Sequence, residues 1–292
     1  FNYQTIEPSN HPTFKPSKPS NHPTFKPSNL QTIQTIQTIK PSGMSAHFQY
    51  LLQLADNNLI LSQRLGEWCG HGPVLEQDIA ITNITLDLLG QARMLFTYAG
   101  EVEGRGRTED DLAYFRDAHQ FFNVLLVEQP NEDWAYTMVR QFFFDTFQYY
   151  NYTALLKSRD ERLAAIAEKA LKEVTYHLRY SSEWMVRLGD GTETSHHKMQ
   201  AALDDLWMFS GELTAPGEAE RLMAEAGIAP DPAELKAAWE RKVTAILQEA
   251  TLKTPAGTWM QSGGKAGRHT EHLGYILSDM QHLQRTYPGN NW

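Results

Sequence analysis

The chain has 292 residues, a formal net charge of −9 and a single cysteine, Cys69. A negative chain is poorly suited to bind nucleic acid or an anionic membrane surface. One cysteine cannot form an internal disulfide, and no apolar run approaches the roughly 20 residues of a membrane-spanning helix. We therefore expect an acidic cytoplasmic protein that binds neither nucleic acid nor a membrane.

Residues 1–43 differ in composition from everything that follows. The segment 8–17 recurs identically at 19–28, and Gln-Thr-Ile is repeated three times between Gln31 and Ile39. Low hydrophobicity, repeated proline and absent periodicity predict a disordered, low-complexity segment. Because Met44 follows directly, we interpret residues 1–43 as an added leader or linker, with a proline-rich docking arm as the alternative. Residues 44–292 would then form a single helical domain.

From Met44 onward, the apolar residues recur at helical spacing. One stripe comprises Leu51, Leu52, Ala55, Leu59 and Leu65, and a second comprises Ile81, Ile84, Leu88, Ala92 and Leu95. A helix that begins at an N-cap on Thr108 is expected to run toward Leu126, before Pro130. Further helices are expected over 133–157, 160–189, 194–213, 218–226, 232–250 and 270–286, with Pro or Gly at their boundaries. Two helices, a long connection and two more helices predict an all-α four-helix bundle with additional C-terminal helices.

The core of such a bundle can hold a carboxylate-bridged di-iron site. That site needs a Glu from each of two helices and Glu-x-x-His from each of the other two. Here the residue three after Glu173 is Tyr176, and His177 is turned roughly 100° further round the helix. On another helix Asp87 is followed three residues later by Gly90, which cannot bind a metal.

The sequence therefore indicates a metal site that has been lost, in a chain that binds no metal itself. A working but irregular site is the alternative. Asp56 and Asp145 supply the acids on the remaining two helices of the bundle. The vestigial positions are Asp56, Asp87, Gly90, Asp145, Glu173, Tyr176 and His177.

The helix over 133–157 carries aromatic residues on more than one side. A helix of that kind must be buried on both sides, either by its own bundle or by a partner subunit. We expect it to contribute to a partner interface through outward aromatic side chains such as Tyr149 or Tyr152.

Four segments carry a resemblance to a known family: Leu61–His71, Leu86–Arg93, Leu125–Asn131 and Thr270–Gly274. They resemble the C subunits of bacterial ring 1,2-phenylacetyl-CoA epoxidases, the multicomponent oxygenases of phenylacetate degradation. The resemblance covers essentially Met44 to Trp292 and does not extend to the first 43 residues.

The resemblance implies a ferritin-like, metal-free subunit without catalytic residues of its own. Its partners would be a homologous catalytic A subunit that holds the di-iron centre, other subunits that include a reductase, and phenylacetyl-CoA near the subunit interface. A coenzyme A pocket needs cations and an apolar wall. The candidate contacts are Glu76, Gln77, Asp78 and Ile79, and Arg221, Leu222 and Met223. A self-sufficient di-iron monooxygenase with an altered ligand set and a stand-alone acyl-CoA-binding helical protein are the competing hypotheses.

Overall fold

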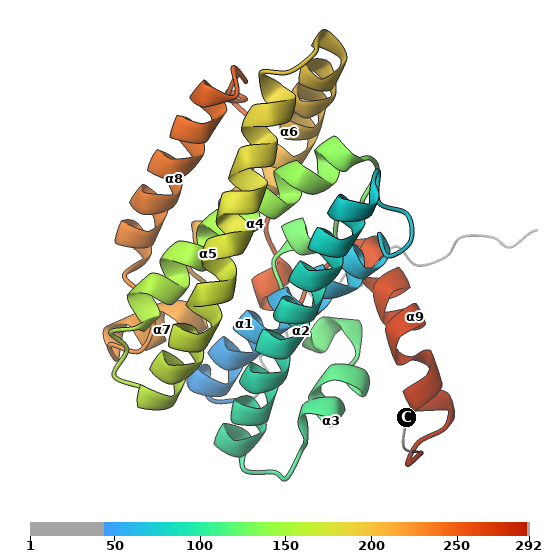
Figure 1. Ribbon diagram of the computed structural model, residues 1–292. Coiled ribbons are helices and arrows are strands. Elements are labelled where there is room, and N and C mark those ends of the chain that lie inside the picture. The colour runs from blue at the N-terminus through green and yellow to red at the C-terminus, as the bar shows by residue number, and fades with distance from the viewer. Residues whose placement is uncertain (1–43, 291–292) are drawn as a thin grey trace, which may run out of the picture. The chain divides into compact units, whose positions relative to one another are not determined.

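Four long helices form the centre of the fold in the computed structural model, which describes residues 44–290. They are α1 (Ala46–Gly66), α2 (Leu75–Glu103), α4 (Trp134–Leu155) and α5 (Glu161–Gly189). Figure 1 shows α1 lying along α2 and α4 along α5, and contacts between α2 and α5 join the two pairs. Within the described residues there is no strand, so the predicted all-α bundle is confirmed. The interpretation of residues 1–43 as a disordered leader lies outside the described residues.

The ends of these helices follow from local sequence signals. The side chain of Ser45 accepts a hydrogen bond from the Phe48 amide at 3.1 Å, and Asp160 does the same for the Leu163 amide at 2.9 Å. Each satisfies one of the amides that a helix N-terminus leaves without a partner. Helix α2 ends at Gly104, whose φ of 69° is the left-handed conformation that glycine adopts without strain.

The connection from α2 to α4 is the part of the fold that the sequence predicted wrongly. The helix expected from Thr108 toward Leu126 stops at Tyr114, so that α3 spans only Glu109–Tyr114. Short 3₁₀ turns follow at Ala118–Gln120 (η1) and Leu125–Glu128 (η2). The amides of Phe122 and Val124 donate to the side chains of Asp56 and Asn57 on α1, each at 2.8 Å. Side chains of α1 therefore accept hydrogen bonds from backbone amides that a continuous helix would have bonded to its own carbonyls.

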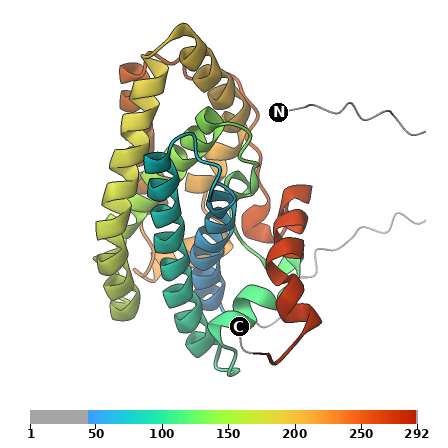
Figure 2. The same cartoon turned by 45° about the vertical axis from the view of Figure 1, so that its right-hand side comes forward.

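The C-terminal half adds helices around the bundle. These are α6 (Glu193–Thr214), α7 (Glu218–Glu225), α8 (Pro232–Glu249) and α9 (Glu271–Thr286), with a 3₁₀ turn, η3, at Gly264–Ala266. Helices α6 and α8 pack on α4, and α7 packs on α1. Helices α8 and α9 lie on opposite sides of the bundle in Figure 1 and again in the turned view of Figure 2. No helix among residues 44–290 is both long and apolar enough to cross a membrane.

The aromatic helix α4 is buried by the chain's own C-terminal helices. The ring of Phe143 lies 5.7 Å from the ring of Trp207 on α6 and 5.7 Å from that of Trp239 on α8. Tyr152 is buried and Tyr149 is half-buried. The expectation that Tyr152 faces outward toward a partner was therefore wrong. The aromatic pattern of α4 required that its second side be buried as well, and α6 and α8 cover that side.

Candidate functional site

A layer of hydrogen-bonded polar side chains crosses the interior of the four-helix bundle. Asn58 of α1 donates to the Tyr152 hydroxyl at 3.1 Å, and Gln148 donates to the side-chain oxygen of Asn58. The side-chain oxygen of Gln91 on α2 accepts from Gln148 at 3.1 Å and from Tyr152 at 3.3 Å. Gln91 in turn donates to the Glu173 carboxylate of α5 at 2.9 Å. We call Asn58, Gln91, Gln148, Tyr152 and Glu173 the core polar layer.

A second polar group lies one helical turn away along α2 and α5. His177, which is fully buried, approaches a carboxylate oxygen of Asp87 at 2.9 Å. On α4 the Gln141 amide donates to Asp145 at 2.6 Å. Burial raises the pKa of Asp145 to about 6, although His177, Ser181 and Gln141 oppose that shift. The protonated and ionised forms of Asp145 are therefore balanced near pH 6, well above the range in which an exposed Asp titrates.

The donor set of this interior does not fit a di-iron centre. Three of the inward positions are amides, Asn58, Gln91 and Gln148, and they are engaged with one another. Bridging iron centres in such bundles use carboxylates and imidazoles instead. No three His, Cys, Asp or Glu side chains are grouped to hold a metal ion anywhere in the described part of the chain.

Gly90 and Tyr176 lie on the outside of the bundle. The di-iron pattern in the sequence had instead predicted that these two positions, which would have carried the lost imidazoles, face inward. Tyr176 is 47% exposed, and a Cβ built on Gly90 would meet no atom within 4 Å. The inward residues are their neighbours, Gln91 and His177, four residues after Asp87 and Glu173. The expected inward orientation of Gly90 and Tyr176 was therefore wrong by one residue.

Asp56 does not face this interior either. Its carboxylate accepts two hydrogen bonds from the Arg116 guanidinium, one of them at 3.1 Å, and one from the Phe122 amide at 2.8 Å. Both members of the ion pair are buried. Burial raises the pKa of Asp56, and the charge and hydrogen bonds of Arg116 oppose that shift. Arg116 also lies against the Phe121 ring, 4.1 Å from its centroid.

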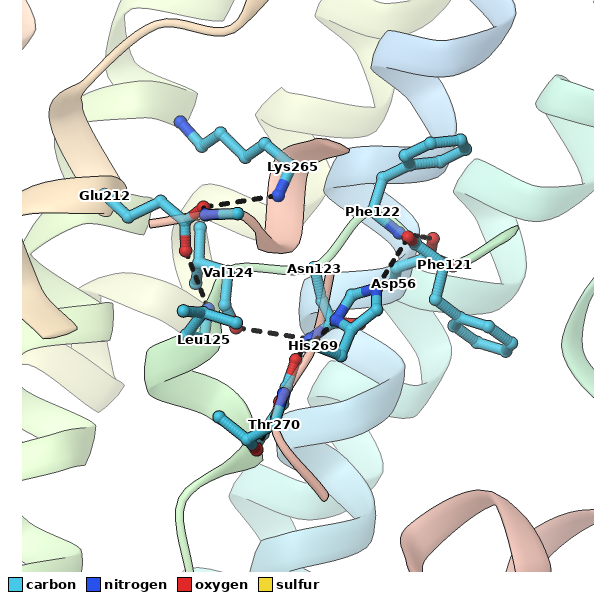
Figure 3. A network of polar contacts seen from close by, with 12 residues as sticks. Asp56, Phe121, Phe122, Asn123, Val124, Leu125, Glu212, Lys265, His269 and Thr270 are labelled. Carbon is cyan, nitrogen blue, oxygen red and sulfur yellow. Dashed lines mark hydrogen bonds and ion pairs between the residues drawn. The ribbon is translucent and has the colours of Figure 1, made fainter. Parts of the chain in front are cut away.

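Two further buried carboxylates hold the same crossover segment. Glu212 of α6 accepts hydrogen bonds from the amides of Leu125 and Gly263, each at 2.8 Å. Glu128 accepts from the Asn123 side chain at 2.9 Å and from the amide and hydroxyl of Thr270 at 2.9 and 2.7 Å. Figure 3 shows residues 121–125 held among Asp56, Glu212 and His269. We call Asp56, Glu128 and Glu212 the carboxylate clamp.

His269 lies between the clamp residue Glu128 and the backbone of the crossover. Its Nδ1 lies 2.6 Å from Glu128 and its Nε2 lies 2.8 Å from the Phe121 carbonyl. Because both neighbours are acceptors, both ring nitrogens must carry protons. Burial lowers the pKa of His269, but the hydrogen bond and charge of Glu128 outweigh burial and raise it overall.

The loop that carries His269 needs glycine where it approaches the crossover. A Cβ on Gly264 would lie 2.1 Å from the Asn123 carbonyl oxygen, and Gly263 has a φ of 142°, which other residues adopt only with strain. The clamp therefore joins four distant parts of the sequence: α1, the crossover, α6 and the loop before α9.

Comparison with known proteins identifies the family. The family model described as "Phenylacetic acid catabolic protein" matches residues 29–292. The chain belongs to this family. It is also 54% identical over 243 residues to the Escherichia coli (strain K12) protein named as the C subunit of 1,2-phenylacetyl-CoA epoxidase, a match that covers 83% of this chain and 98% of that protein. The family match begins 15 residues before Met44, within the segment that the sequence had set apart.

The two segments suggested for substrate contacts lie near opposite ends of α1. Glu76–Ile79 belong to the first turns of α2, which follow the C-terminal end of α1. Arg221–Met223 belong to α7, whose Glu220 lines a small cavity with Tyr50 and Leu54 in the N-terminal half of α1. Asp78 accepts from the Gly72 amide at 2.9 Å, and Gln77 accepts from the Tyr180 hydroxyl at 2.7 Å. The Arg221 guanidinium donates to the Pro216 carbonyl at 2.9 Å.

Sequence reasoning assigned no role to Asn58, Gln91, Glu128 or Glu212. A signal for Gln91 was present in the sequence, because Asp87–Gln91 and Glu173–His177 share a spacing of four residues. When two packed helices carry polar residues at the same spacing, the polar residues of one helix can bond to those of the other. Here Asp87 pairs with His177 and Gln91 pairs with Glu173. Nothing local marks Glu128 or Glu212, since their partners come from distant segments.

Proposed function

We propose that this chain is a non-catalytic, structural subunit of a bacterial multicomponent di-iron oxygenase that epoxidises the aromatic ring of phenylacetyl-CoA. The observation that carries the proposal is the 54% identity to a protein named as the C subunit of such an epoxidase, across 98% of that protein. The interior of the bundle supports it, since the amides of the core polar layer engage one another where an active homologue would need metal ligands. In this proposal the chain works in the cytoplasm and binds no cofactor.

The partner in this proposal is the homologous catalytic A subunit, which would hold the di-iron centre. Other subunits, a reductase among them, would complete the assembly, with phenylacetyl-CoA near the subunit interface. The present chain would stabilise the A subunit and help to shape the site for the thioester.

The surface that we propose for this partner is one side of α2. Leu75, Ile79, Leu86 and Leu89 are 71%, 52%, 60% and 40% exposed, respectively. At 100° per residue their spacings place them within a narrow arc of the helix. An exposed apolar stripe of this kind marks an interaction surface in soluble proteins. We call these four leucine and isoleucine residues the α2 face.

The α2 face begins among the residues suggested for substrate contacts. Ile79 belongs to both sets, and Glu76 precedes it by less than one turn. A thioester bound near the interface would therefore contact Glu76–Ile79 rather than Arg221–Met223, which lie toward the other end of α1.

The test is co-purification with the catalytic subunit after co-expression. Replacing Ile79 and Leu86 together by Glu should abolish association, because each carboxylate would be left without water at an apolar interface. The thermal melt of the isolated chain should change little, since both side chains are exposed. The matched control is Tyr275→Glu on α9, an equally exposed residue, 66%, outside the α2 face.

Retained association in the α2 double variant would refute the interface, and failure of the wild type to associate with any catalytic subunit would refute the role.

Iron analysis separates the proposal from a self-sufficient oxygenase. Two tightly bound iron ions per isolated chain would show that the chain has its own centre. Tight binding of phenylacetyl-CoA by the isolated chain, without any partner, would favour a stand-alone acyl-CoA-binding protein.

A further inference from the structure

A groove between α5 and α8 has the chemistry of a small-molecule site. It has a volume of about 640 Å³, within the roughly 300–1,000 Å³ of ligand pockets. Leu178 and Val186 of α5 and Ile246 of α8 form an apolar wall, and Tyr149 and Tyr150 of α4 add two aromatic rings. Those rings lie edge to face with centroids 5.3 Å apart. We call this cavity the α5–α8 groove.

Its polar groups are incompletely satisfied within the protein. The Ser182 hydroxyl is buried and has no hydrogen-bond partner among residues 44–290, although a buried hydroxyl normally has one. Lys242 is half-buried, and none of the ion pairs among the described residues includes it. Arg187 contacts the Trp184 ring at 5.3 Å, but it too has no acidic partner in the described part of the chain.

The charges around the groove limit the kind of ligand that it could bind. The cations that line it are Arg179, Arg187 and Lys242, and the acids are Glu183 and Glu249. Arg179 is already paired with Glu183 at 3.0 Å, which leaves two cations against the carboxylate of Glu249. These five groups carry a net charge of +1, which a single carboxylate would balance, whereas a polyphosphate would leave an excess of negative charge.

A second, larger cavity offers a useful contrast. It has a volume of about 930 Å³ and lies between α6, α8 and residues 254–262. None of the side chains that line it has a buried polar atom without a partner among the described residues: Trp239 donates to the Phe143 carbonyl at 3.0 Å, and Ser210 donates to the Trp207 carbonyl at 2.8 Å. Lys236, which lines that cavity, lies 3.8 Å from Glu240. The larger cavity therefore shows no comparable demand for a ligand.

We propose that the α5–α8 groove binds a monoanionic aromatic carboxylate. Arg187 and Lys242 supply the positive charge for the carboxylate, and the Tyr149 and Tyr150 rings contact the aromatic body. The inference concerns the chain alone and does not rest on the proposed subunit role.

Isothermal titration of the full chain with 1-naphthylacetate tests the proposal. Saturable binding is expected, and the neutral isostere 1-naphthylacetamide should bind at least about tenfold more weakly, since charge-assisted hydrogen bonds contribute roughly 1.5–3 kcal/mol. This arm uses only the wild-type protein and is independent of any folding defect. Equal affinity for acid and amide would overturn the proposal, because it would show an apolar groove without anion selectivity.

Two variants locate the site. Lys242→Gln should weaken 1-naphthylacetate binding about tenfold, whereas Lys236→Gln, the same charge change on the same helix at the other cavity, should leave it unchanged. Thermal melts confirm that both variants are folded. A loss of binding in Lys236→Gln alone would place the ligand in the larger cavity and overturn the assignment.

Titration with coenzyme A is the last test. Tight, Lys242-dependent binding of this polyanion in place of 1-naphthylacetate would likewise overturn the monocarboxylate specificity.

Discussion

The core polar layer and the carboxylate clamp both bury polar groups, but they do so with different chemistry. In the core polar layer, amides and a phenol exchange hydrogen bonds between α1, α2 and α4, and the one carboxylate, Glu173, is at the edge. In the carboxylate clamp, Asp56, Glu128 and Glu212 are buried, and each accepts several hydrogen bonds from cations or backbone amides.

The difference shows where the bundle tolerates charge. A buried carboxylate is stable only when its oxygens are supplied with donors. The irregular crossover can supply them, because its backbone amides are not committed to a helix. Helices α1, α2, α4 and α5 offer the bundle interior no free amides, so the core polar layer consists mainly of neutral side chains that pair with one another. The clamp consequently holds the crossover, while the core polar layer joins α1, α2 and α4 through hydrogen bonds between mainly neutral side chains.

The largest predicted effect comes from breaking the clamp at Asp56. Asp56→Leu would leave the Arg116 guanidinium buried without a carboxylate, and the Phe122 amide would lose its acceptor. Loss of one member of a buried ion pair costs about 3–5 kcal/mol of unfolding free energy. Urea denaturation followed by circular dichroism measures the change.

Two controls sharpen this prediction. Glu183→Gln breaks the exposed pair with Arg179 and should cost less than about 1 kcal/mol. The double variant Asp56→Leu with Arg116→Met should be less destabilised than Asp56→Leu alone, because no unpaired charge remains. A double variant as unstable as the single one would show that Arg116 matters mainly through its bonds to the carbonyls of Leu112 and Gln120.

A smaller effect is expected from Asp145, the acid in the bundle interior that lacks the clamp's donors. One of its oxygens has no partner among the described residues, and its pKa is raised to about 6. Between about pH 4 and pH 6 the folded chain keeps this proton while the unfolded chain has lost it. The contribution of Asp145 to the free energy of unfolding therefore falls as pH rises through that window and is constant above it.

Asp145→Asn should remove that slope. Relative to the wild type, the variant should gain up to about 2–3 kcal/mol of unfolding free energy between pH 4 and pH 6.5, since each pKa unit corresponds to about 1.4 kcal/mol. Denaturation curves at several pH values in this range provide the measurement. A difference between variant and wild type that stays constant across the range would mean that Asp145 is ionised in the folded protein throughout.

The architecture was predictable from sequence because its signals are local. The stripes at Leu51–Leu65 and Ile81–Leu95, the cap at Asp160 and the Pro or Gly boundaries gave the helices that the structure contains, within a few residues. The crossover was not predictable in the same way. Thr108 and its acidic neighbours do begin a helix, but Asp56, Asn57 and Glu212 decide where it ends, and those residues are far away in sequence.

The candidate site was predictable in composition but not in orientation. Glu173 and Asp87, two of the predicted vestigial metal positions, bond to Gln91 and His177 across the contact between α2 and α5, and their origin as former ligands stays a prediction. The inward faces of α2 and α5 were predicted wrongly. The di-iron pattern places its ligands three residues apart, whereas the inward polar residues of this chain are four residues apart. Asp56 was misplaced for a different reason: α1 is buried on nearly all sides, so its apolar stripe does not distinguish the face toward the bundle interior from the face toward the crossover.

The smallest predicted effect follows from that orientation. Replacing both Gly90 and Tyr176 by His restores the Asp-x-x-His and Glu-x-x-His spacing in sequence, but both positions lie on the outside of the bundle. The change in unfolding free energy should stay within about 0.5 kcal/mol, as for most surface substitutions. The variant should also retain no iron after anaerobic loading with Fe²⁺ and gel filtration, because the new imidazoles cannot reach Asp145 and the core amides remain in place. An absorption spectrum of an oxo-bridged iron pair in this double variant would show that α2 and α5 can rotate to bring those positions inward, and that the core polar layer is less fixed than its hydrogen bonds indicate.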